Sequence, residues 1–172
     1  MTSELMKKIE EDVALRFLKI YNTRNGCAFE IIQIGEAPDI YCEDKKSGEK
    51  LYLEISTHEN LEGDIRKEFE RLRGERYTLG NSLGQRGNIE NILKNLRILL
   101  EKKLQASYSN SPTALVIGRV ITIWSCREWQ IFAVKMAQEV FQGKEQNYPK
   151  GVWIFCTTDD TTNEDILNLM EI

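Results

Sequence analysis

The chain is poor in the residues on which several common kinds of functional site depend. It has a single histidine, His58, and four cysteines that are far apart and form no CxxC pair. One histidine offers little basis for a Ser-His-Asp or Cys-His catalytic group, and scattered cysteines lack the spacing of a zinc site. The sequence also contains no P-loop and no GxGxxG motif.

Long hydrophobic runs are absent as well. No apolar segment approaches the roughly 20 residues of a membrane span, and Met1–Leu5 lacks the basic start and apolar core of a signal peptide. We therefore expect a cytoplasmic protein whose cysteines are reduced and structural. With 172 residues, of which 41% are hydrophobic and 29% charged, the chain has the size and composition of one globular domain, residues 1–172.

The most informative residues lie in two short segments, Pro38–Ile40 and Leu51–Ser56, separated by the turn-forming Asp44–Gly48. This pattern predicts two strands of a hairpin. Because side chains alternate along a strand, Glu54 lies opposite the apolar face of its own strand and can face Asp39 across the hairpin. Two carboxylates on adjacent strands suit Mg²⁺ or Mn²⁺ bound against a phosphate.

At these residues the chain resembles the PD-(D/E)xK nuclease superfamily. Pro38-Asp39 matches the first half of the motif and Glu54-Ile55-Ser56 the second, with Ser56 where lysine is most common. The resemblance implies a restriction-endonuclease-like α/β fold, with a mixed central sheet flanked by helices. It also implies a metal-dependent nuclease that hydrolyses DNA. Asp39, Glu54 and the Ile55 carbonyl would hold Mg²⁺ or Mn²⁺, and Ser56 would donate a hydrogen bond behind them.

Two predicted helices offer further site residues. In the helix over 3–21, Glu10 falls within the apolar arc. The resemblance makes it an extra glutamate near the metal, and the alternative is a carboxylate at the core edge that reaches solvent. In the helix over 88–108, Lys103 lies inside the apolar stripe, whereas Lys94 and Lys102 point outward. Lys103 either replaces the lysine missing at position 56 or extends past the core to water.

Positive charge is concentrated downstream of the carboxylates. Residues 66–103 carry ten basic and five acidic side chains, in a chain whose net charge is −4. A local positive surface suits a DNA partner. We expect a helix over 59–73 and a glycine-rich loop over 74–87. The loop and the end of the helix before it supply the expected nucleic-acid contacts, Arg73, Arg76 and Arg86. The alternatives are a solvated helix face and a disordered loop.

The rest of the chain predicts further strands and helices. Strands are expected over 27–34, 114–123 and 151–157, and a helix over 125–141. Thr162 and Asp165 resemble the capping box of a final helix. The oligomeric state is open, and a homodimer is compatible with the sequence.

Two other functions remain open at this point. One is a catalytically inactive member of the same fold, with an active site that has lost its lysine at Ser56, that binds nucleic acid or a protein. The net negative charge favours this function. The other is a structural protein in which Asp39 caps a turn. His58 is either a surface loop residue or a proton shuttle.

Overall fold

The computed structural model describes residues 3–57, 89–108, 111–118, 125–158 and 163–171. In chain order the elements are α1 (Ser3–Asn25), β1 (Phe29–Ile34), β2 (Ile40–Asp44), β3 (Lys50–Thr57), α3 (Ile89–Lys103), β4 (Thr113–Gly118), α4 (Cys126–Phe132), α5 (Val134–Phe141), a 3-10 turn (Glu145–Asn147), β5 (Val152–Thr157) and β6 (Glu164–Asn168). None of the helices within these ranges is long and apolar enough to cross a membrane.

Within the described residues, the strands form one six-stranded mixed sheet in the order β1-β2-β3-β4-β5-β6. β1, β2 and β3 make an antiparallel meander, β3, β4 and β5 are parallel neighbours, and β6 returns antiparallel to β5. The predicted α/β class with a mixed sheet flanked by helices is therefore confirmed.

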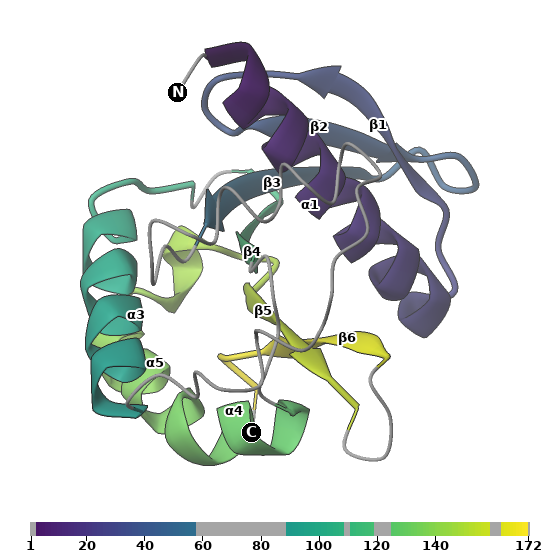
Figure 1. The fold of residues 1–172 in the computed structure, drawn as a ribbon. Coiled ribbons are helices and arrows are strands. Elements are labelled where there is room, and N and C mark those ends of the chain that lie inside the picture. Colours follow the sequence, from purple (N-terminus) through teal and green to yellow (C-terminus); the bar gives the residue numbers. More distant parts are fainter. Residues whose placement is uncertain (1–2, 58–88, 109–110, 119–124, 159–162, 172) are drawn as a thin grey trace.

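Helices cover both faces of this sheet (Figure 1). α1 packs on one face, where its buried Val13 and Phe17 meet Leu53 of β3 and Phe155 of β5 in one cluster. α3, α4 and α5 gather on the other face, in a second cluster that contains Leu115 of β4. Along β4 and β5, successive side chains belong alternately to the first and the second cluster, as expected for parallel strands buried on both sides.

The turn between β2 and β3 is held by Asp44. Its Oδ1 accepts hydrogen bonds from Ala28 N and Lys46 N, both at 3.0 Å, and its Oδ2 accepts one from Ser47 Oγ at 2.9 Å. These bonds lower the pKa of Asp44. Glu43-Asp44-Lys45 also matches the ExK pattern of the motif, but it belongs to this structural turn. Asp39 and Glu54 therefore remain the candidate carboxylate pair.

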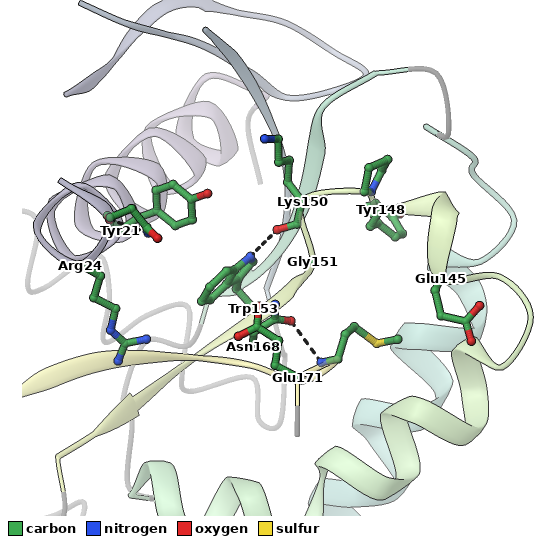
Figure 2. Close-up of a pocket in the computed structure, with 12 residues that line it drawn as sticks. Tyr21, Arg24, Glu145, Tyr148, Lys150, Gly151, Trp153, Asn168 and Glu171 are labelled. Carbon is green, nitrogen blue, oxygen red and sulfur yellow. Dashed lines mark hydrogen bonds between the residues drawn. The ribbon is translucent and has the colours of Figure 1, made fainter. Parts of the chain in front are cut away.

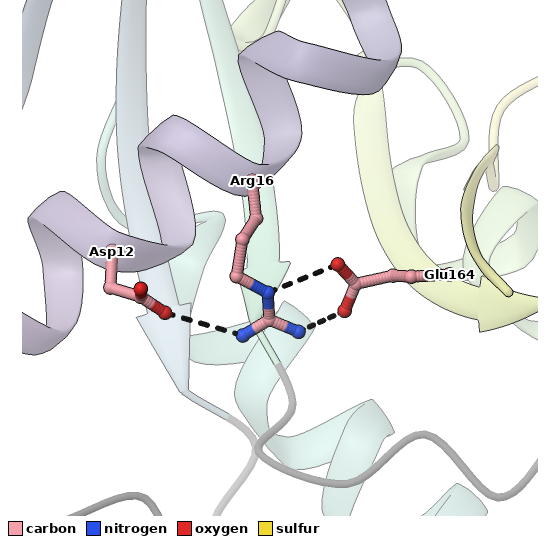
Figure 3. Close-up of polar contacts among 3 residues, drawn as sticks. All are labelled: Asp12, Arg16 and Glu164. Atoms are coloured by element: carbon pink, nitrogen blue, oxygen red, sulfur yellow. Dashed lines mark hydrogen bonds and ion pairs between the residues drawn. The ribbon is translucent and has the colours of Figure 1, made fainter. Parts of the chain in front are cut away.

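The edge strand β6 is tied to α1 by an ion pair (Figure 3). Arg16 Nε donates to Glu164 Oε2 at 3.0 Å, and Arg16 Nη2 donates to Glu164 Oε1. The same guanidinium lies 3.5 Å from Asp12 Oδ2 and 5.0 Å from the centre of the Phe155 ring. A planar guanidinium holding a carboxylate through two bonds orients both groups, so this contact fixes β6 against the helix.

Four expectations about the second half of the chain differ from the structure. The helix expected over 88–108 ends at Lys103, five residues early. The final helix is wrong, because residues 164–168 form β6 and pair with β5. The helix over 125–141 divides at Ala133 into α4 and α5. Cys126 and Cys156 form a disulfide with Cα atoms 4.9 Å apart, so the expectation of four reduced cysteines is not met, although Cys27 and Cys42 are free.

Candidate functional site

The β2–β3 hairpin brings the two predicted carboxylates together. Ile40 pairs with Leu53 in the antiparallel register, and continuing this register by one residue beyond β2 would set Asp39 opposite Glu54. Side chains opposite each other in such a pair have Cβ atoms roughly 4.5 to 5.5 Å apart. The backbone N–H of Ile55 donates to Asp39 Oδ2 at 2.7 Å, and this bond holds the aspartate just before the start of β2.

The turn before Asp39 is tight and needs a glycine. Gly35 N donates to Asp39 O at 2.7 Å, closing the turn. A Cβ atom at position 35 would lie 2.7 Å from Pro38 O, so a larger residue would displace the backbone beside the aspartate. The close approach of the backbone in this turn therefore helps to position Asp39 just before β2.

Glu54 is buried and receives donors from two sides. Lys103 Nζ, at the C-terminal end of α3, donates to Oε1 at 2.6 Å. Tyr108 Oη donates to Oε2 at 2.9 Å. A buried carboxylate requires such partners, since an unpaired buried charge is strongly unfavourable. Lys94 and Lys102 are exposed, whereas Lys103 is partly buried and reaches the sheet.

A second layer of contacts holds these two donors in place. Tyr148 Oη donates to the backbone carbonyl of Lys103 at 3.1 Å, and the Tyr108 and Tyr148 rings lie 5.7 Å apart. Tyr108 N donates to Asn147 O at 3.1 Å, and Asn147 Nδ2 donates to Leu104 O at 3.4 Å. The chain after α3 is thus anchored to the segment before β5.

The electrostatics of the site are those of crowded carboxylates. Burial raises the pKa of Asp39 to about 7, and the negative charge of Glu54 acts in the same direction, against the Ile55 hydrogen bond. Burial also raises the pKa of Glu10 on α1, again with help from Glu54 and against Lys103. Burial and the hydrogen bond to Glu54 raise the pKa of Tyr108, which keeps its hydroxyl a donor.

This charge distribution suits a cation. Asp39 and Glu54 present hard oxygens, and among the described residues no donor contacts Asp39 Oδ1. In the same part of the chain, no three carboxylate, imidazole or thiol groups form a set that could hold a metal. Mg²⁺ is usually held by one or two carboxylates with water and substrate phosphate completing its shell, so a pair of carboxylates fits it.

The other predicted site residues fall in different places. Ser56 lies two residues beyond Glu54 in β3 and is partly buried, and Glu10 is half-buried on α1. Arg73, Arg76 and Arg86 lie outside the described residues, as do His58 and the helix and loop expected over 59–87. The structure therefore brings together Asp39, Glu54 and Lys103, with the charge of Glu10 acting on them.

Comparison with known proteins gives no relative. No protein-family model, no curated protein and no solved structure matches the chain. The proposed function therefore rests on the residues of the site.

A separate pocket of about 700 Å³ lies between the C-terminal end of α1 and the segments around β5 and β6 (Figure 2). Trp153 is central to it, and its Nε1 donates to Lys150 O at 2.7 Å. The two basic side chains of the pocket are paired, Arg24 with Asp165 at 2.6 Å and Lys150 with Glu49 at 2.7 Å. Of the predicted site residues that the structure describes, none lines this pocket.

Sequence reasoning missed Tyr108 and Tyr148. Tyr108 follows α3 in a segment without regular structure, and no motif marks it. The available signal was its position five residues after Lys103, close enough in sequence for both side chains to reach one acceptor. Tyr148 acts through the backbone of Lys103, a contact that leaves no pattern in the sequence.

Proposed function

We propose that the chain is a metal-dependent nuclease that hydrolyses DNA phosphodiester bonds. The observation that carries the proposal is the meeting of three elements at one point: Asp39 before β2, Glu54 in β3 and the ammonium of Lys103 from α3. A carboxylate pair with an adjacent lysine is the set of groups that the PD-(D/E)xK resemblance requires. Here the lysine comes from a helix, in place of the motif position that Ser56 occupies.

Each residue has a distinct role in this proposal. Asp39, Glu54 and the Ile55 carbonyl would hold Mg²⁺ or Mn²⁺, which when bound activates water and polarises the phosphate. Lys103 stabilises the negative charge that develops on the phosphate oxygens. Ser56 would donate a hydrogen bond near the carboxylates, and Glu10 adds negative charge that favours cation binding.

The order of elements also supports the proposal. A restriction-endonuclease-like core runs helix, three-stranded meander, helix, strand. The described part of the chain has α1, the β1–β3 meander, α3 and then β4, which pairs in parallel with β3. We propose on this basis that residues 1–172 form one such domain.

Cleavage of plasmid and single-stranded DNA, with Mn²⁺, with Mg²⁺ and with chelator, tests this function. We expect metal-dependent cleavage that Asp39→Asn abolishes. Lys103→Met should fold and still bind metal, but should lose roughly 10² to 10³ in rate, the effect of removing one charge stabiliser. Lys102→Met and Lys94→Met are matched controls on exposed positions of α3. Equal activity in all three lysine variants would contradict the role of Lys103.

The contact with DNA is tested at the arginines. Charge reversal of both Arg73 and Arg76 should weaken DNA binding and flatten its salt dependence, because each lost phosphate contact removes released counterions. Unchanged affinity across a salt series would assign these arginines to a solvated surface.

The second candidate is an inactive member of the same fold that binds nucleic acid or a protein. Ser56 at the motif lysine position and the net charge of −4 favour it. This candidate predicts DNA or protein binding without metal-dependent cleavage, and no measurable affinity for Mn²⁺ in calorimetry.

A further inference from the structure

The ammonium of Lys103 lies among carboxylates, where positive charge is needed. Its Nζ is 2.6 Å from Glu54 Oε1, and the two side chains are 23% and 11% exposed. Its charge also acts on Asp39 and on Glu10, lowering the pKa of each against the effect of burial. One ammonium thus offsets part of the repulsion among three carboxylates.

Both oxygens of Glu54 are engaged by donors of the protein itself. Lys103 holds Oε1 and Tyr108 holds Oε2. A divalent ion binds a carboxylate oxygen at roughly 2.0 to 2.6 Å, and an ammonium on the same oxygen would repel it. Tyr108 is uncharged and can stay, so Lys103 is the group that has to leave.

We infer that Lys103 is an internal counter-ion that competes with the divalent ion for Glu54, so that metal binding releases the lysine toward the substrate. This inference rests on the proposed function, because it takes Asp39 and Glu54 as the metal site. The flexible four-carbon side chain of lysine permits the movement, and its ammonium is a mobile point charge suited to a phosphate. Lys103 would then stabilise a substrate only after the metal is in place.

Mn²⁺ affinity measured by calorimetry tests the competition without any activity assay. Lys103→Met keeps most of the side-chain packing and removes the charge. We expect it to bind Mn²⁺ about 10-fold to 100-fold more tightly than wild type, the range of one hydrogen bond between charged groups. Lys7→Met is the matched control, because the charge of exposed Lys7 also acts on Glu10, and its affinity should change less than threefold.

A second measurement uses the wild-type protein and so does not depend on the variant folding. In ¹⁵N NMR spectra of the lysine ammonium groups, the Lys103 signal should move or broaden when Mg²⁺ is added. The Lys150 ammonium, which pairs with Glu49 at 2.7 Å, is the internal control and should stay unchanged.

The outcomes separate this inference from the proposed function. Metal binding by wild type, with equal or weaker binding by Lys103→Met, would overturn the competition and leave the nuclease proposal standing. A Lys103 signal unaffected by saturating Mg²⁺ would do the same. Absence of divalent-ion binding in both wild type and Lys103→Met would overturn both.

Discussion

Asp39→Asn should make the protein more stable at neutral and alkaline pH. Burial and the charge of Glu54 raise the pKa of Asp39 from 3.8 to about 7 in the folded chain. The raised pKa means that the folded state favours the protonated acid. Its contribution to stability is fully present below pH 3.8 and is lost as the pH rises to about 7.

The size of the effect follows from that difference. At 1.36 kcal/mol per pKa unit the rise corresponds to at most about 4 kcal/mol, and solvent screening of a partly exposed carboxyl reduces it to about 2 kcal/mol. Asn keeps an acceptor for Ile55 N, so the backbone hydrogen bond survives. We expect the variant to be about 2 kcal/mol more stable than wild type at pH 8, which raises Tm by roughly 4 to 8 °C.

Urea unfolding followed by circular dichroism at pH 8, 5.5 and 4 measures this difference. The advantage of Asp39→Asn should shrink as the pH falls and vanish near pH 4. Glu43→Gln, at an exposed position of the same strand, is the control and should show no such trend. Equal stabilities at pH 8, or an advantage that grows on acidification, would refute the electrostatic account. Mn²⁺ at about 100 times its Kd should reverse the order by stabilising wild type by about 2.7 kcal/mol.

Two further predictions concern the scaffold. Glu164→Gln should weaken the paired contact with Arg16 and cost about 1 kcal/mol of unfolding free energy, because hydrogen bonds to charged groups are stronger than those between neutral groups. Glu101→Gln, in an exposed ion pair, should cost less than about 0.5 kcal/mol. Equal costs in the two variants would contradict the structural role of the Arg16–Glu164 contact. Gly118→Ala should cost about 1 to 3 kcal/mol by overpacking, because its Cβ would lie 2.8 Å from both γ-carbons of Val13. Adding Val13→Ala should recover part of that loss in a double-mutant cycle, and strict additivity would show that the two sites do not touch.

The first half of the fold could be predicted because its patterns are local. The alternation in residues 51–56 and the turn at Asp44–Gly48 specify a hairpin, and its register follows from which face is apolar. Residues 164–168 contain too short a pattern to separate helix from strand. They form β6 because β5 offers a free edge, and that pairing is a tertiary effect. The disulfide joins cysteines 30 residues apart, and no spacing motif in the sequence predicts it.

In the candidate site, too, local patterns could be predicted from the sequence and tertiary contacts could not. The placement of Glu54 on the face of β3 opposite Leu53 and Ile55, and the inward direction of Lys103, follow from the periods of a strand and a helix. The meeting of Lys103 with Glu54 depends on how α3 lies across the sheet, which a helical wheel does not contain. The helix predicted over 88–108 includes Tyr108, whereas α3 ends at Lys103, so the contact of Tyr108 with Glu54 needed the structure.

The parallel pairing of β3 with β4 has a consequence for the order of folding. The β2–β3 hairpin joins residues close in sequence, and such hairpins form in roughly 1 to 10 μs. The pairing of Glu54 with Leu115 closes a long loop and has to form later. During folding, the hairpin therefore brings Asp39 and Glu54 together before α3 delivers Lys103 and Tyr108. We expect the nascent hairpin to be electrostatically frustrated, and the docking of α3 to relieve that frustration.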